Sequence, residues 1–178
     1  VIGNNLFEQA VHKKKITDPA EILNEVSREM QELFGRDGDE GSINDGMDVA
    51  LCRISADKKE LVFAGANNAA YIVRDGVLLE LDPDRQPIGA HGGNIKSFTA
   101  RHTNLQTGDC IYIGTDGFAD QFGGPKSKKF QSRQVQEMLV AIGSMQMHLQ
   151  QIHVSKVFHD WKGDTEQTDD VCIIGVRI

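Results

Sequence analysis

Patterns typical of helices and patterns typical of strands occupy separate blocks of this 178-residue sequence. Two amphipathic helical stretches come first, and the second begins at Asp18, with Pro19 in the first helical position. Short strand-like runs separated by turns follow, and the clearest hairpin signal among them is Asp75-Gly76. Helical patterns then return, and the chain closes on an apolar run. This segregation favours an α+β fold with a largely antiparallel sheet over a doubly wound parallel one.

Apolar periodicity and turn signals set the expected boundaries of the elements. The last run, 171–176, is apolar almost throughout, which predicts a central strand buried on both faces. Helices are expected at 130–142 and 145–161. The other expected strands span 48–54, 60–64, 69–73, 77–81, 95–100 and 109–113.

Charge and cysteine content narrow the class of protein. The formal net charge is −7 without a basic stripe, which disfavours nucleic-acid binding. No stretch has the pattern of a membrane-spanning helix or a signal peptide, so we expect a cytoplasmic protein without membrane insertion. The three cysteines, Cys52, Cys110 and Cys172, match no zinc-binding spacing. We therefore expect buried, reduced thiols.

Aspartates stand at the ends of two apolar runs. The expected strand 109–113 leads directly into Asp116 and Gly117, and Asp169 and Asp170 directly precede the final run. If these strands pair antiparallel, the carboxylates meet at one edge of the sheet. Two carboxylates about 4 Å apart repel by roughly 4 kcal/mol at an effective dielectric constant of about 20, so a divalent cation between them would be stabilising. Carboxylate oxygens suit Mg²⁺ or Mn²⁺. The alternative, that both aspartate motifs are ordinary turns, stays open at this point.

The residues around these aspartates resemble a known family. Residues 115–124, followed by Lys128-Lys129-Phe130, resemble the metal-binding segment of SpoIIE-type protein phosphatases, which belong to the metal-dependent serine/threonine phosphatase (PPM) family. Residues 161–163 and 167–171 resemble the last metal motif of that family, and residues 42–48 and 63–68 are similar to its intervening strands. The resemblance covers essentially the whole chain. It implies an α/β/β/α sandwich with mostly antiparallel sheets.

The resemblance also implies a role for each matching residue. Asp116 and Asp169 would be catalytic residues and ligands of a two-metal centre holding Mn²⁺ or Mg²⁺. Asp120 would hold a third, weaker metal ion, and Gly117, Asp170 and Asn68 would line or support the site. The implied reaction is hydrolysis of phosphoserine or phosphothreonine on a regulatory protein, of which small anti-sigma-antagonist domains are the typical example. A water molecule that bridges the metal ions would attack phosphorus directly.

One part of the family pattern is missing from this sequence. The first half-site of the family is a Gly-Asp-x-x-Gly turn with an earlier acidic residue, and neither is found in residues 1–178. The resemblance therefore implies a single phosphatase domain, 1–178, that is truncated at its N-terminus and has an incomplete metal site and little activity. Absent first strands would leave an apolar sheet edge unpaired, which predicts self-association.

Two other functions remain compatible with the sequence. The chain can be a non-catalytic protein-binding module in signalling that kept the phosphatase fold. It can also be a purely structural α+β domain in which Asp116 and Asp169 only form turns. A Gly-Asp-x-x-Gly turn in the parent's upstream sequence would separate the phosphatase from the binding module. Asp116→Ala and Asp169→Ala would separate the structural domain, because only a metal site loses ion binding when its carboxylates are removed.

Overall fold

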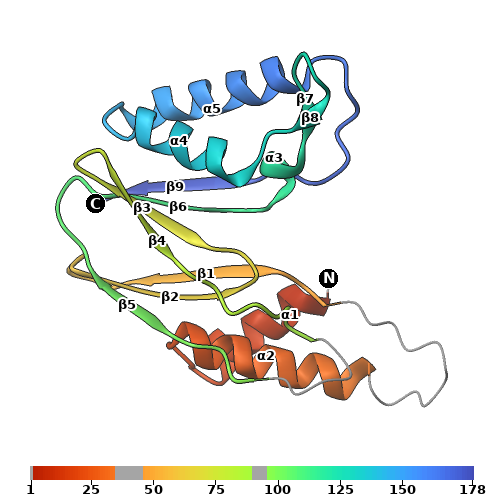
Figure 1. Cartoon of the computed structure of the whole chain (residues 1–178). Helices are drawn as coiled ribbons and strands as arrows, with labels where there is room; N and C mark the ends of the chain where they lie inside the picture. The colour runs from red at the N-terminus through yellow and green to blue at the C-terminus, as the bar shows by residue number, and fades with distance from the viewer. Residues whose placement is uncertain (1, 35–45, 90–95) are drawn as a thin grey trace. The chain divides into compact units, whose positions relative to one another are not determined.

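The computed structural model describes residues 2–34, 46–89 and 96–178 (Figure 1). The chain divides into two compact units. The first contains residues 1–69 and 81–105, and the second contains residues 70–80 and 106–178. Residues 42–45, which belong to one of the family-like segments, lie outside the described residues, as do residue 1 of the first expected helix and residue 95 of an expected strand.

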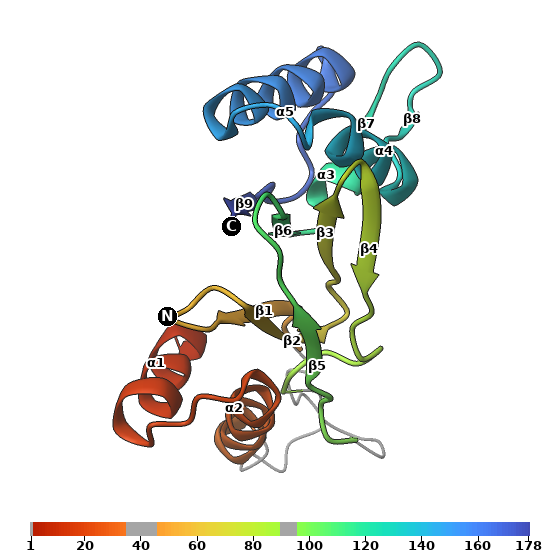
Figure 2. The ribbon, with the colours of Figure 1, turned by 90° about the vertical axis from the view of Figure 1, so that its left-hand side faces the viewer.

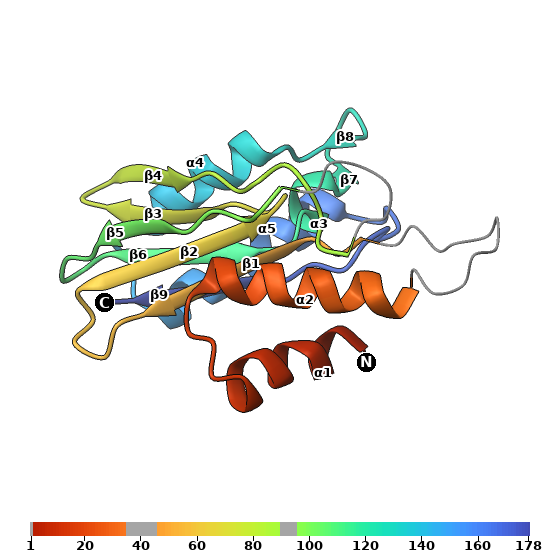
Figure 3. The same ribbon diagram turned by 90° about the horizontal axis from the view of Figure 1, so that it is seen from below.

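The first unit packs helices against one face of a three-stranded antiparallel sheet with the order β1-β2-β5 (Figure 3). Asp18 begins the long helix as predicted, because its Oδ1 accepts hydrogen bonds from the amides of Ala20 (2.9 Å) and Glu21 (3.1 Å). The buried helix residues Leu23 and Val26 join the core that contains Ala64 of the sheet. The elements are α1 (Ile2–Glu8), the π-helix η1 (Gln9–Lys13), α2 (Pro19–Phe34), β1 (Val49–Ile54), β2 (Glu60–Ala66) and β5 (Arg101–Asn104).

The second unit contains a four-stranded sheet with the order β4-β3-β6-β9 and a separate two-stranded hairpin, β7-β8. Two helices, α4 and α5, lie over one face of the larger sheet, and Phe118, Leu139 and Phe158 belong to the core between them (Figure 1). The elements are β3 (Ala70–Arg74), β4 (Val77–Leu81), β6 (Cys110–Gly114), α3 (Gly117–Asp120), β7 (Phe122–Gly123), β8 (Lys128–Lys129), α4 (Ser132–Ile142), α5 (Met147–Lys162) and β9 (Ile173–Arg177).

The mixed helix and antiparallel sheet architecture expected from the order of the sequence patterns is confirmed. Asp75 and Gly76 both have positive φ angles, 49° and 77°, and form the predicted turn between β3 and β4. A partly buried ion pair joins β3 to the residue directly before β6. The Arg74 guanidinium donates to both carboxylate oxygens of Asp109, at 2.8 and 2.6 Å, and holds the pKa of Asp109 below its usual value.

The final strand corrects one expectation. We predicted a central strand buried on both faces, but β9 lies at the end of the strand order and pairs only with β6 in the described part of the chain. The side chains of Ile174 and Val176 are therefore 52% and 41% exposed. An apolar run indicates a strand, but the number of its neighbours determines its burial.

The expected strand 95–100 is also wrong, because residues 96–100 are irregular and the strand β5 begins at Arg101. Side chains distant in the sequence bind the backbone here. Asn24 Oδ1 accepts from the Phe98 amide (2.8 Å), and Asp84 Oδ2 accepts from the Thr99 amide (2.7 Å). These amides are therefore unavailable to a neighbouring strand.

The cysteines follow the expectation only in part. All three are free thiols, as predicted. Cys110 is buried and Cys52 is partly buried, and burial raises the pKa of the Cys52 thiol to about 11. Cys172 is exposed, contrary to the expectation, because it precedes the edge strand β9. In the described ranges, every helix is too short or too polar to cross a lipid bilayer.

Candidate functional site

The ends of β6 and β9 bring two aspartate segments of the second unit together. These strands pair antiparallel with Gly114 opposite Ile173, so the condition set in the sequence analysis is met (Figure 1). Beyond the strands, Thr115 continues the contact. Its amide donates to the Cys172 carbonyl (3.0 Å), its hydroxyl donates to the Asp170 carbonyl (2.8 Å), and the Cys172 amide donates to the same hydroxyl oxygen (3.0 Å). We call residues 115–117 and 169–172 the Thr115 junction.

Gly117 permits the close approach of the two segments. A Cβ atom at this position would lie 2.5 Å from the carbonyl oxygen of Asp170, which is too short for any side chain. Gly117 begins α3, and Asp116 immediately precedes it. The contact therefore fixes the backbone of Asp116 beside the segment that carries Asp169 and Asp170.

The carboxylates of the junction face solvent. Asp116, Asp169 and Asp170 are all exposed. Asp169 Oδ1 accepts from the Asp170 amide (2.7 Å), whereas the Asp116 carboxylate has no hydrogen-bond partner in residues 2–34, 46–89 and 96–178. Their oxygens are thus available to a ligand from solvent.

Two residues predicted for the site have other surroundings. The carboxylate of Asp120, the expected ligand of a third metal ion, accepts a hydrogen bond from the Lys129 ammonium (2.8 Å), so a cation there would compete with an existing ion pair. Asn68 belongs to the first unit and follows β2. Its backbone amide donates to the Ala66 carbonyl (2.7 Å). The roles of both residues stay predictions.

The structure adds two residues that sequence reasoning missed. Thr115 joins the two aspartate segments, as described above. Gln121 is 1% exposed and connects α3, α5 and the segment before Asp169. Its side-chain amide donates to the Glu166 carbonyl (3.0 Å), and its backbone carbonyl accepts from Trp161 Nε1 (3.0 Å). The sequence around Gln121 contains other polar residues, such as Asp120, and gives no signal that this side chain is buried. In the structure it is hydrogen-bonded, as buried polar side chains are.

The donor chemistry of the junction fits a hard divalent cation, since carboxylate oxygens are the ligands that Mg²⁺ and Mn²⁺ prefer. The number of donors is smaller than a closed site needs. In the described part of the chain, no three His, Cys, Asp or Glu side chains are grouped so that they could hold a metal ion. Asp116 and Asp169 can therefore supply part of a metal site, and further ligands would have to join them.

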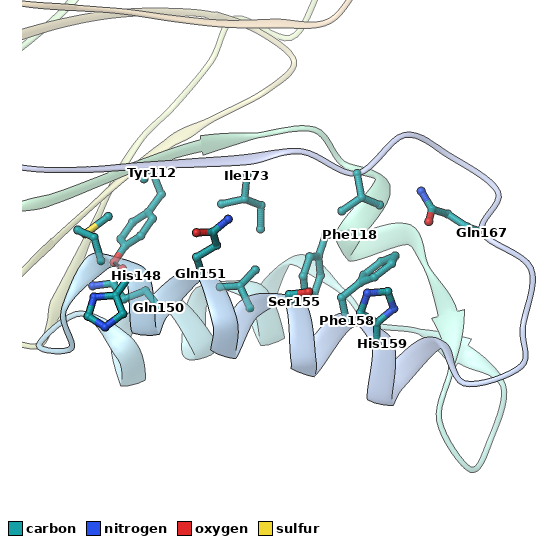
Figure 4. Close-up of a pocket in the computed structure, with 14 residues that line it drawn as sticks. Tyr112, Phe118, His148, Gln150, Gln151, Ser155, Phe158, His159, Gln167 and Ile173 are labelled. Atoms are coloured by element: carbon teal, nitrogen blue, oxygen red, sulfur yellow. Dashed lines mark hydrogen bonds between the residues drawn. The ribbon is translucent and has the colours of Figure 1, made fainter.

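A groove of about 740 Å³ lies between α5 and β9 (Figure 4). Tyr112 lines one end, where its hydroxyl donates to Gln150 Oε1 (2.7 Å), and burial raises its pKa. Gln167 lies at the other end (Figure 4), and Val171 is also among the lining residues, so the groove reaches the segment that carries Asp169 and Asp170. Ile173 of β9 forms part of its wall.

Comparisons with known proteins bear on the family and the fold of the chain. The family model for Stage II sporulation protein E (SpoIIE) matches residues 4–178. The chain is similar to the SiaA-PP2C domain of Pseudomonas aeruginosa, with 26% identity and a TM-score of 0.88 over 99% of this chain and 68% of that one. It also resembles the phosphatase domain of the cell fate determinant SpoIIE from Bacillus subtilis, with 13% identity and a TM-score of 0.60 over 99% of this chain and 73% of that one.

A third similar structure contains the RsbU and RsbW domains of Rv1364c from Mycobacterium tuberculosis, with 16% identity and a TM-score of 0.73 over 98% of this chain and 45% of that one. No curated protein sequence matches the chain. The family match covers nearly all of the sequence, and the solved structures share the arrangement of helices and antiparallel sheets. The chain therefore belongs to the SpoIIE family and has the fold of the PP2C-type phosphatase domains.

Proposed function

We propose that this chain is part of a metal-dependent protein phosphatase that hydrolyses phosphoserine or phosphothreonine on a regulatory protein. The Thr115 junction carries this proposal, because it holds the backbones of Asp116 and Asp170 against each other at the end of two paired strands. Membership of the SpoIIE family and the PP2C fold support a phosphatase. A phosphorylated partner of the anti-sigma-antagonist type fits the regulatory setting of this family.

In this proposal some residues of the junction bind the metal ions and others position those ligands. Asp116 and Asp169 would hold the divalent cations, Mn²⁺ or Mg²⁺, which when bound neutralise phosphate charge and make a water molecule acidic. Thr115 and Gly117 position these aspartates through backbone contacts. The exposure of the carboxylates lets a phosphorylated side chain of another protein reach them.

The 178-residue chain by itself is expected to bind metal weakly and to turn over little substrate. Two or three carboxylates at one sheet end are fewer than two divalent cations require. A two-metal centre would therefore need additional carboxylates from outside the described residues.

Metal binding and turnover test the proposal separately. We expect titration calorimetry with Mn²⁺ to show binding that Asp116→Asn and Asp169→Asn each weaken by about tenfold or more, because each removes one ligand. Asp164→Asn is the matched control, since this exposed aspartate lies in the same unit outside the junction. Equal binding by all three variants would place the metal elsewhere and overturn the site.

Robust hydrolysis of a phosphopeptide by the unaltered chain with Mn²⁺ would contradict the incomplete metal site.

The second candidate is a binding module without catalysis. The small number of grouped donors in the described part of the chain favours it. This function predicts that a phosphopeptide binds equally well with and without Mn²⁺, and that Asp116→Asn leaves the affinity unchanged. Mn²⁺-dependent affinity would exclude it.

A further inference from the structure

The β7-β8 hairpin of the second unit is basic, although the whole chain carries a net charge of −7. Lys126 lies in its turn and Lys128 and Lys129 form β8, and all three side chains are exposed. Figure 2 shows the hairpin projecting from the unit beyond α3 and α4. Three cations on one exposed hairpin of an acidic protein form a charged patch that needs an explanation.

Most basic side chains of the second unit already have partners. Lys129 pairs with Asp120, and the remaining partnered side chains bind either a carboxylate or a backbone carbonyl. In the second unit, all of whose residues the structure describes, the ammonium groups of Lys126 and Lys128 have no hydrogen bond or ion pair. The other partnered side chains are Arg74 with Asp109, Arg133 with Glu137, Lys156 with Asp160, Lys162 with the Thr165 carbonyl, and Arg177 with the Gly143 and Met145 carbonyls.

The hairpin is fixed to the body of the unit. The amide of Gly124 donates to the Trp161 carbonyl (2.8 Å), and a Cβ atom at Gly123 would lie 1.9 Å from the same oxygen. The Gln121 carbonyl accepts from Trp161 Nε1 (3.0 Å), and the Gln131 amide donates to the Ala119 carbonyl of α3 (2.7 Å), so both ends of the hairpin are bonded to the body of the unit. The two free ammonium groups are therefore carried by a backbone that is anchored next to α3, the helix that begins directly after Asp116.

The exposed ring of the hairpin does not share a face with Lys128. Phe122 of β7 stands opposite Lys129 in the hairpin register, so these two side chains share one face, whereas Lys128 stands opposite Gly123 on the other face. The free ammonium groups of Lys126 and Lys128 therefore carry the charge of this surface without an apolar neighbour from β7. Such a surface suits an acidic segment of a protein better than an apolar one.

We propose that Lys126 and Lys128 form a docking surface for an acidic segment that flanks the phosphorylated residue of the substrate protein. This inference rests on the proposed phosphatase function and names the chemistry of the substrate. The net charge of −7 would repel an acidic phosphoprotein at long range, and the hairpin supplies the opposite charge beside the candidate site.

Binding of three labelled peptides to the 178-residue chain tests the surface. The first contains phosphoserine between acidic residues, the second contains phosphoserine between neutral residues, and the third is acidic without phosphate. We expect Lys126→Glu combined with Lys128→Glu to weaken the binding of both acidic peptides by about tenfold or more. The salt dependence of acidic-peptide binding should also largely disappear. Binding of the neutral phosphopeptide should change much less.

The matched control combines Lys13→Glu with Lys15→Glu, which changes the net charge equally at exposed positions of the first unit. An equal loss of affinity in this control would reduce the effect to overall charge and overturn the proposal. Tighter binding of a single-stranded oligonucleotide than of the acidic phosphopeptide would also overturn it. If the hairpin variant unfolds, acetylation of the unaltered chain decides the question: the acidic peptide must protect Lys126 and Lys128.

The outcomes separate this inference from the proposed function. Hairpin-dependent peptide binding without Mn²⁺ binding at Asp116 and Asp169 would leave the docking surface intact and remove the phosphatase. Mn²⁺ binding at the junction together with unchanged peptide affinity in the hairpin variant would support the phosphatase function and rule out the docking surface.

Discussion

The strands β2 and β9 are both largely apolar, yet they differ in burial. β2 lies between β1 and β5, and residues 61–66 are all buried. β9 pairs only with β6 in the described part of the chain, and Ile174 and Val176 remain 52% and 41% exposed. Apolar composition therefore indicates that a segment is a strand, whereas its place in the sheet decides how much of it leaves water.

The two edges of β9 also have different consequences for the candidate site. The inner edge pairs with β6 and leads to the Thr115 junction, which positions the segments of Asp116 and Asp169. The outer edge has no partner strand in the ranges that the structure describes. The inner edge thus bears on the proposed function, and the outer edge is the place where we expect self-association.

Truncation of a buried side chain gives the largest expected contrast between the two strands. Phe63→Ala in β2 removes a ring that is 0% exposed and should cost about 3–5 kcal/mol of unfolding free energy. Ile174→Ala in β9 should cost less than about 1 kcal/mol, since half of that side chain already contacts water. Urea denaturation of both variants measures the difference. A cost at Ile174 close to that at Phe63 would mean that β9 is covered in solution.

Local patterns explain which parts of the fold could be predicted. The Asp18 cap, the Asp75-Gly76 turn and the apolar periodicities depend on residues close in sequence, and they gave correct elements. The strand expected at 95–100 failed because Asn24 and Asp84, far away in the sequence, bind its amides. Central and edge strands likewise differ only through distant neighbours.

Some residues of the candidate site could also be proposed from the local sequence, and others could not. Asp116 and Asp169 could be proposed because each adjoins an apolar run. The pairing of β6 with β9 that brings their segments together was only a condition at that stage, and the structure supplies it. Thr115 and Gln121 could not be proposed, because their structural roles depend on hydrogen bonds to residues that are distant in the sequence.

Glycine substitutions sharpen the contrast between the junction and the middle of β9. Gly117→Ala places a methyl group 2.5 Å from the rigid Asp170 carbonyl oxygen and should cost about 1–3 kcal/mol. We also expect Mn²⁺ affinity to fall, since the segments of Asp116 and Asp169 must separate. Gly175→Ala is the control, because the atom closest to its new methyl group is the flexible end of the Met147 side chain, at 3.0 Å. This variant should lose less unfolding free energy than Gly117→Ala and should keep its Mn²⁺ affinity. Calorimetry that finds equal Mn²⁺ affinity in the two variants would contradict the role of the Gly117 contact.

Self-association at the outer edge of β9 is the smallest expected effect, because one strand edge buries little surface. An unpaired strand offers free amides and carbonyls to another copy of the chain, and Ile174 adds an exposed apolar side chain. We expect light scattering to show an apparent mass that rises with concentration, and Ile174→Lys to suppress this rise by charge repulsion. Val77→Lys, at a residue that is 60% exposed on the edge strand β4, is the matched control and should leave the mass unchanged. A monomer at every concentration would contradict the prediction, and suppression by Val77→Lys alone would move the association to the opposite edge of the sheet.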